Sequence, residues 1–118
     1  MDGRMSLTKI AKQLSTWETR HVDCIDIDVQ VKRLSLVEMQ EAERLTESCS
    51  LGNGQNRHVN NLPKLVWTMV GRWFRDVDGN PLAGDDSLED AKEWPSSMVS
   101  ELMTAFSSVN TASDPDPN

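Results

Sequence analysis

Tyrosine is absent from this chain, cysteine occurs only twice, and no apolar run approaches the roughly 20 residues of a membrane-spanning helix. We therefore expect no membrane contact. A leader of the secretory type, with a positive start, an apolar centre and a small-residue cleavage site, is also missing. With so few cysteines, these absences predict a reduced, cytosolic protein.

Motifs that carry chemistry are equally scarce. Neither G-x-G-x-x-G nor G-x-x-x-x-G-K-[ST] occurs, so no loop is predicted to cradle a phosphate. The run Asp76–Asn80 alternates oxygen ligands as a calcium loop does. An EF-hand, however, needs Gly at its sixth position and Glu at its twelfth, whereas Gly79 is fourth here and Ser87 is twelfth. We interpret this run as a plain turn.

Histidine and cysteine provide the only candidates for a soft metal. We expect them on a strand and around a loop, where convergence on one ion is improbable, and no activating base can be placed beside either thiol. We predict no catalytic residue, no metal site and no cofactor. The four residues concerned are His21, Cys24, Cys49 and His58.

Charge is negative overall and unevenly distributed. Residues 1–75 hold 11 basic and 9 acidic side chains (+2), whereas residues 76–118 hold 1 basic and 10 acidic (−9), which together give the net charge of −7. Nucleic-acid binding gains most of its free energy from basic side chains that displace counterions, so we expect no nucleic-acid partner. The acidic half is interpreted either as a solubilising face or as one that orients a partner.

The first half of the chain changes from helical to strand periodicity. Residues 1–20 form an N-terminal segment in which spacings of three and four predict a short amphipathic helix. Apolar residues then alternate with polar ones and predict a half-buried strand over residues 24–34. Its partner is left open: either residues 14–20 fold back as a hairpin, or the strand edge pairs with another subunit. The alternating apolar residues are Ile25, Ile27, Val29 and Val31.

Three further helices are predicted. Ser35 and Glu38 form a capping box that starts a helix ending near residues 46–48, with Leu36, Val37, Met39 and Leu45 inward. Residues 49–60 are predicted to be a mobile loop. A wide apolar stripe then predicts a helix over residues 62–77, stopped by the turn at 78–81, and a short turn of helix follows at 87–92. The last helix is predicted from residue 95 or 96 to 109.

These elements predict a small, mainly α domain with a short β-hairpin or a single strand near the N-terminus. We assign residues 21–110 to one helical domain with the leading strand 24–34, and residues 111–118 to a disordered tail. The apolar stripes of the last two long helices are wider than one neighbour covers, so they predict either a core or a partner-binding groove. The candidate residues are Val66, Met69, Val70, Trp73, Met98, Leu102, Met103 and Phe106.

Four segments in order resemble the tail assembly chaperones of long-tailed bacteriophages, over about residues 25–110. In that family a β-segment enters a helix through a [KR]-x-L-[ST]-x-x-E step, a later helix ends in a D-x-D-G-x-P turn, and a Leu-Pro or similar pair opens the last helix. Trp94 stands where an aliphatic residue is usual before Pro, and about 20 residues precede the strand. The matching segments are Val31–Leu36, Glu38–Glu41, Arg72–Leu82 and Trp94–Phe106.

The resemblance implies a non-enzymatic protein that self-associates and keeps the phage tape measure protein soluble until tail tube subunits polymerise around it. It further implies action in the host cytoplasm, absence from the mature virion and, in many members, a longer frameshifted form that recruits the tail tube protein. The alternative is a small acidic regulator, such as an antirepressor or DNA mimic, whose acidic segment occupies a basic protein surface. The Gly and Pro residues of that segment argue against the rigid scaffold that a mimic needs.

Overall fold

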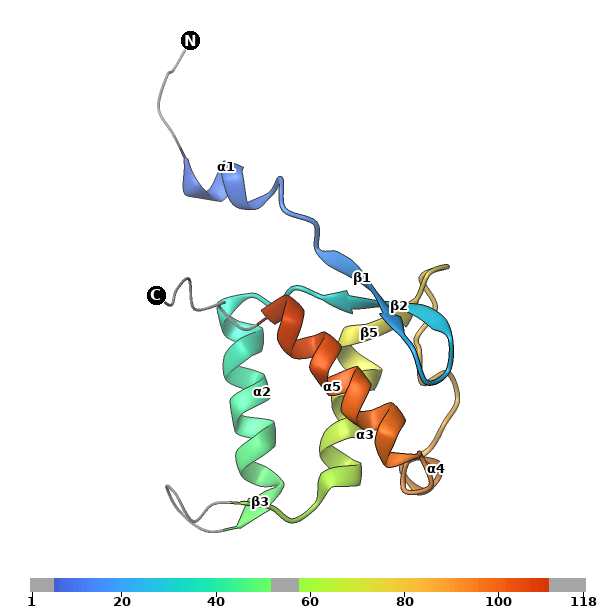
Figure 1. Ribbon diagram of the computed structural model, residues 1–118. Helices are drawn as coiled ribbons and strands as arrows, with labels where there is room; N and C mark the ends of the chain where they lie inside the picture. Colours follow the sequence, from blue (N-terminus) through green and yellow to red (C-terminus); the bar gives the residue numbers. More distant parts are fainter. Residues whose placement is uncertain (1–5, 52–57, 111–118) are drawn as a thin grey trace, which may run out of the picture.

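A three-stranded antiparallel sheet forms the centre of the structure (Figure 1). The computed structural model describes residues 6–51 and 58–110. The strands are β1 (Trp17–Val22), β2 (Ile27–Lys32) and β5 (Phe74–Asp76), in the order β1-β2-β5. The helices α3 (Leu62–Trp73) and α5 (Ser96–Asn110) both lie beneath this sheet in Figure 1.

The remaining elements are shorter or lie to the side. Helix α1 (Leu7–Ala11) projects from the body and buries no residue, and α2 (Leu36–Ser48) stands beside α3 (Figure 1). A two-residue ladder joins β3 (Ser50–Leu51) to β4 (His58–Val59), and α4 (Leu88–Ala91) precedes α5. Among the described residues, no helix is long and apolar enough to cross a membrane.

The hairpin of β1 and β2 settles which segment pairs with the predicted strand. The register runs from Trp17 opposite Lys32 to Val22 opposite Ile27. The turn between the strands needs one residue with positive φ, and Asp26 takes it at 52°, a conformation that a short polar side chain tolerates better than most. The fold-back prediction is thereby confirmed, although the predicted boundary after residue 20 falls inside β1.

The predicted mainly helical class was wrong, because the sheet is the centre of the fold and a third strand was missed. The predicted helix over residues 62–77 ends at Trp73, and Phe74 adopts an extended backbone (φ −125°, ψ 147°). Residues 74–76 then pair with the free edge of β2, with Arg75 opposite Gln30. Pairing with β2 therefore outweighs the helical sequence pattern of residues 74–76. The chain is an α+β domain.

The turn after β5 is held by a carboxylate. Asp76 accepts hydrogen bonds from the backbone N–H groups of Asp78 and Asn80, each at 2.9 Å, and Gly79 has a φ of +91°. Both bonds lie within the turn, so Asp76 stabilises the local backbone, as an Asx-type turn does. The structure thus shows the plain turn that the spacing predicts.

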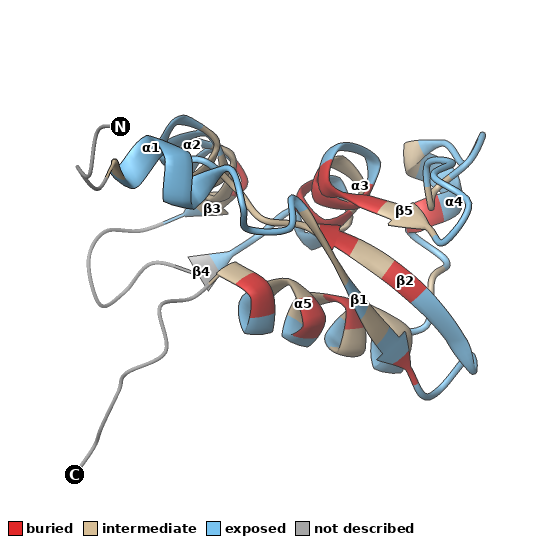
Figure 2. Cartoon of the chain, turned by 90° about the horizontal axis from the view of Figure 1, so that it is seen from above, coloured by how far each residue is buried: buried red, intermediate tan, exposed pale blue. Residues whose placement is uncertain are grey.

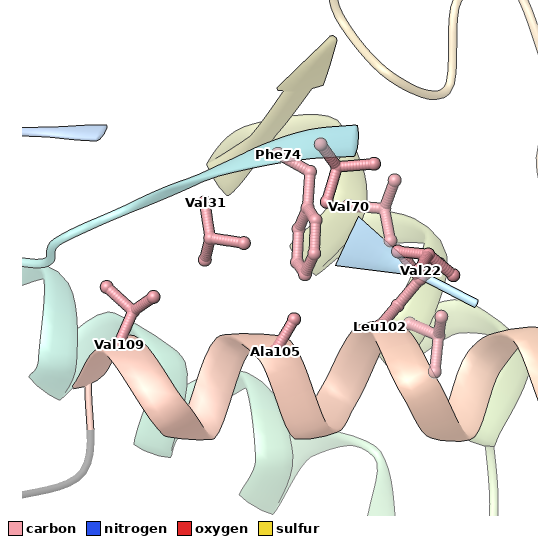
Figure 3. Packing of buried hydrophobic residues seen from close by; sticks show 9 residues of the cluster. Val22, Val31, Val70, Phe74, Leu102, Ala105 and Val109 are labelled. Carbon is pink, nitrogen blue, oxygen red and sulfur yellow. The ribbon is translucent and has the colours of Figure 1, made fainter. Parts of the chain in front are cut away.

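The main core lies between the sheet and the two helices beneath it. In Figure 3, Phe74 points between Val31 and Val70 toward α5, where Ala105 faces it. The buried positions of α5 are three and four residues apart, as an amphipathic helix requires. Figure 2 shows the buried stretches of β2, α3 and α5 in red. This core comprises Val22, Val29, Val31, Val66, Val70, Phe74, Leu102, Ala105 and Val109.

Helix α2 begins as predicted but presents a different face. Ser35 Oγ accepts from the Glu38 N–H and a Glu38 carboxylate oxygen accepts from the Ser35 N–H, which confirms the capping box. Leu36 and Val37, predicted to face inward, are 87% and 67% exposed. The helix packs through Leu45, as predicted, and through Ala42, together with Leu34 before it, onto a second cluster of Cys49, Leu65, Met69 and Trp73.

Other helix predictions are confirmed, and part of the loop prediction was wrong. Helices α4 and α5 form where they are expected, with Ser87 as the N-cap of α4. The segment 49–60 was predicted to be a loop, but β3 and β4 pair within it. The predicted tail at 111–118 lies outside the described residues.

The end of α5 is joined to the β2–α2 connection by Asn110. Its side-chain oxygen accepts from the Leu34 N–H at 2.8 Å, and its amide donates to the Lys32 carbonyl at 2.9 Å and to the Phe106 carbonyl at 3.3 Å. This one side chain therefore satisfies backbone groups from β2, α5 and the connection to α2 at a part-buried junction. Such groups become costly when their partner is removed.

We predict that Asn110→Asp lowers the free energy of unfolding by about 1–3 kcal/mol, because a carboxylate keeps one acceptor but loses both donors to the carbonyl groups. Urea denaturation monitored by circular dichroism measures the change. Ser107→Ala, at an exposed position one turn earlier in α5, is the control and should change stability by no more than about 0.5 kcal/mol. Equal effects for the two variants would contradict the role given to Asn110.

Candidate functional site

A pocket of about 400 Å³ opens between the first halves of α3 and α5, next to α4. Its wall is mostly apolar, with one cationic side chain, Lys92, whose ammonium group lies 2.8 Å from the Glu89 carboxylate. Apolar concave sites of this size suit a hydrophobic side chain or a small part of a helix. The lining residues are Leu62, Pro63, Val66, Ala91, Lys92, Trp94, Ser96, Val99, Ser100 and Met103.

Local sequence signals build the rim of this pocket. Asn61 caps α3 by accepting from the Lys64 N–H at 3.4 Å, and Pro63 lies in the first turn, where its missing N–H costs nothing. Ser87 and Asp90 form a capping box on α4. The backbone N–H of Trp94 then donates to the Ala91 carbonyl at 3.1 Å, which closes the turn after α4, and Trp94 lines the pocket together with Ala91 and Ser96.

A second pocket of about 320 Å³ has Trp94 in its wall as well. It lies between α5, the hairpin turn and the segment after β5. That segment is tied to α3, because the Trp67 indole N–H donates to the Asp86 carbonyl at 2.9 Å. We call the two cavities the Trp94 pockets. The second is lined by Ile25, Ile27, Val70, Leu82, Ala83, Asp86, Trp94, Pro95, Met98 and Leu102.

The eight candidate residues divide between these pockets and the core. Five line a Trp94 pocket, and Val66, Val70 and Leu102 among them are also buried in the main core. The other two, Met98 and Met103, are half-buried.

The remaining three candidates lie elsewhere. Met69 and Trp73 belong to the cluster that faces α2. The Phe106 ring lies 6.0 Å from Trp73 and 6.4 Å from Phe74 between ring centroids, so it joins the two clusters. These three residues line neither Trp94 pocket and act in packing.

Several pocket residues were not predicted. Trp94 stands out in the sequence only as the aromatic residue before Pro95, although it is the one side chain that both pockets share. Leu62 is 50% exposed at the start of α3, and Val99 lies on the α5 face toward it. Ile25 and Ile27 were predicted to be on the buried face of a strand, yet they are about 40% exposed at the hairpin turn. These pocket residues come together only through contacts between segments that are distant in the sequence.

A histidine surrounded by carboxylates occupies the hairpin. His21 Nδ1 lies 2.8 Å from Asp28 Oδ1, and Nε2 lies 3.2 Å from Asp26 and 3.6 Å from Asp23. The hydrogen bond with Asp28, and then the three negative charges, raise the pKa of His21 above its ordinary value. Both ring nitrogens therefore already have carboxylate neighbours, which favours a charged imidazolium over a neutral metal ligand.

The surroundings of the two cysteines do not favour a nucleophilic thiolate. Cys49 is buried in the second cluster, and Cys24 lies in the hairpin turn, where its N–H donates to Glu101 at 3.3 Å. Desolvation, and then the hydrogen bond and charge of Glu101, raise the pKa of the Cys24 thiol, so the reactive thiolate is disfavoured. Among the described residues, no group of three or more His, Cys, Asp or Glu side chains is arranged to hold a metal ion.

The acidic segment is partly engaged in its own local structure. Asp90 completes the capping box of α4, and Glu89 pairs with Lys92. The carboxylates at 85, 86 and 93 are exposed.

The chain was compared with protein-family models, curated proteins and solved structures. No family model, no curated protein and no solved structure matches it.

We predict that an NMR titration finds the pKa of His21 above about 6.5, the ordinary value for histidine, and that Asp28→Asn brings it back toward that value. Because the folded-state pKa is raised, the stabilisation from this group is complete below the unfolded-state pKa and is lost as the pH rises through the folded-state pKa. An unchanged His21 pKa in Asp28→Asn would show that the 2.8 Å contact is not the cause.

Proposed function

We propose that this protein is a tail assembly chaperone that binds an apolar helical stretch of a phage tape measure protein. The observation that carries the proposal is the pair of Trp94 pockets, which are mostly apolar concavities in a chain with a net charge of −7. The order of the four sequence segments that resemble this family supports the choice of client. All four segments include parts of the helices and strands that build the fold: the end of β2, helix α2, the end of α3 with β5, and α5.

The shape of the site suits a helical client. An amphipathic helix recognises a groove through apolar side chains three to four residues apart. Two pockets separated by one indole can receive two such side chains while the helix lies across Trp94. Met98 and Met103 each line one pocket and are half-buried. Their flexible thioether side chains adapt to different apolar surfaces, as a chaperone of a long repetitive client requires.

We assign no enzymatic role. The titratable cluster at His21 is engaged by three aspartates, and the Cys24 thiol is held in its protonated form. In this proposal the protein acts in the host cytoplasm during tail assembly and leaves before the virion is complete. The tail tube protein would be recruited through a longer frameshifted form.

The test is the soluble yield of a co-expressed tape measure protein. We predict that Leu62→Asp reduces the rescued soluble client at least severalfold, because it introduces a charge into the wall of the first Trp94 pocket. The fold should survive, since residue 62 is half exposed and a carboxylate in the first turn of a helix interacts favourably with the helix dipole.

Leu36→Asp is the matched control. Leu36 also occupies the first position of a helix, α2, and is 87% exposed, but it lines neither Trp94 pocket. This variant should rescue the client as the parent chain does. If both variants, with native circular dichroism, rescue fully, the first Trp94 pocket is not the client site. If the parent chain itself fails to raise the soluble yield, the proposed function is wrong.

A further inference from the structure

The two outer edges of the sheet differ. The outer edge of β5 is covered by the chain that follows it. The Asp76 N–H donates to the Asn80 carbonyl at 2.8 Å, and Arg75 and Pro81 form an isolated antiparallel β-bridge. On the other side, β1 is the terminal strand, and no described strand pairs with its outer edge. An open strand edge is a template for pairing with another strand.

The register shows which backbone groups β1 offers. Arg33 N–H donates to the Thr16 carbonyl at 2.7 Å, and these two residues are directly opposed in the extension of the β1–β2 ladder. In an antiparallel pair, hydrogen-bonding residues alternate along each strand, so the even-numbered residues of β1 bond to β2. The backbone N–H and C=O groups of Trp17, Thr19 and His21 therefore point outward. Within the chain the Trp17 carbonyl accepts from the Ser15 hydroxyl, and the Thr19 carbonyl accepts from the Arg20 guanidinium at 2.9 Å. Both are exposed side-chain contacts that a neighbouring strand would replace with backbone hydrogen bonds.

This pattern restricts how β1 could pair with β1 of a second copy. Residues whose backbone groups point outward must lie opposite one another in the two copies. The symmetric registers considered are therefore centred on Thr19, or on Glu18 or Arg20, whose backbone groups point toward β2. Centring on Glu18 places the two Glu18 side chains opposite each other, and centring on Arg20 places two Arg20 side chains together. Centring on Thr19 places Glu18 of each copy opposite Arg20 of the other. Only this register pairs opposite charges, and it does so twice.

The surroundings of the edge suit these two pairs. Glu18 and Arg20 are partly exposed, with side-chain exposures of 28% and 36%, and their own contact is a long one of 3.9 Å. Glu18 also pairs with Arg33 of its own chain at 3.1 Å, so in the dimer its carboxylate would lie between Arg33 and the Arg20 of the other copy. Beside Arg20 lies a pocket of about 290 Å³ between β1 and the outer flank of α5, where the α5 side chains Thr104, Ala105 and Ser108 are small. Arg20 Nε donates to Ser108 Oγ at 2.9 Å and is thereby held at the mouth of this pocket.

We propose that two copies of this chain associate through their β1 strands, antiparallel and centred on Thr19, to form one continuous six-stranded sheet. Each copy places Glu18 against Arg20 of the other at the pocket beside α5. The open β1 edge of the three-stranded sheet is then paired in each copy, and its other edge is covered by described residues, so the assembly closes as a two-fold dimer. This inference does not depend on the tape measure client, and the Trp94 pockets are lined by no β1 residue.

Charge reversal in trans tests the register. Sedimentation velocity of the full chain should show a dimer of twice the 13.3 kDa chain mass. Glu18→Lys and Arg20→Glu should each weaken self-association by about tenfold or more, because two opposite-charge pairs become like-charge pairs. An equimolar mixture of the two variants should restore the dimer. In that mixture the introduced lysine of one copy faces the introduced glutamate of the other, and the unchanged Arg20 faces the unchanged Glu18. This recovery also shows that both variants are folded.

A proline at the centre tests the backbone pairing. Thr19→Pro removes an outward N–H that makes no bond to β2, so the monomer should keep its circular dichroism while the dimer is lost. Glu43→Lys and Arg44→Glu, the same charge reversals at exposed positions of α2, are the controls and should leave the dimer intact.

Three outcomes would overturn the proposal: a parent chain that sediments only as a monomer, a Thr19→Pro variant that dimerises as the parent does, or a mixture of the reversed variants that stays monomeric. The measurements contain no client, so they are independent of the solubility assay. Loss of client rescue with an intact dimer would count against the proposed function alone. A monomeric chain that still rescues the client would count against the dimer alone.

Discussion

The burial of Phe74 at the junction of α3 and β5 is the interaction on which the rest of the fold depends. Its backbone leaves the helical conformation there, and its ring enters the core beneath β2, where it is 2% exposed. The same ring stacks on Phe106 of α5, which in turn contacts Trp73 in the cluster facing α2. One aromatic residue therefore fixes the end of α3, the third strand and the position of α5 relative to both clusters.

The stripes of α3 and α5 serve packing and surface shape at once. Val66, Val70 and Leu102 are nearly inaccessible, yet they form the floors of the Trp94 pockets, so the core and the proposed binding surface share side chains. A substitution in these floors would change stability and binding together. Residues at the rim, such as Leu62, separate the two effects because they are exposed in the free chain.

The polar contacts of this protein lie mostly at element ends and edges. Glu38 caps α2 and pairs with Lys32, and these contacts, the one with Lys32 first, lower the pKa of its carboxyl group. Asn110 joins the end of α5 to β2 and to the connection before α2, and Asp76 closes the turn after β5. Together they satisfy the backbone where it leaves regular structure. At the outer edge of β1 no described strand is paired, and side chains of Ser15 and Arg20 satisfy the Trp17 and Thr19 carbonyls instead.

Features that depend on neighbouring residues could be predicted from the amino-acid sequence: the capping boxes at Ser35 and Ser87, the extents of α2 and α5, and the alternating strand at β2. The long-range partner of each element became known only from the folded structure. The local pattern predicts a helix at residues 74–76, but these residues pair with β2 as a strand. It also predicts that Leu36 and Val37 are in the core, but both are exposed. The pockets beside Trp94 likewise form only where the hairpin, α3 and α5 come together. Caps and periodicity are local free energies, whereas these outcomes depend on contacts between residues far apart in the chain, which a local pattern does not encode.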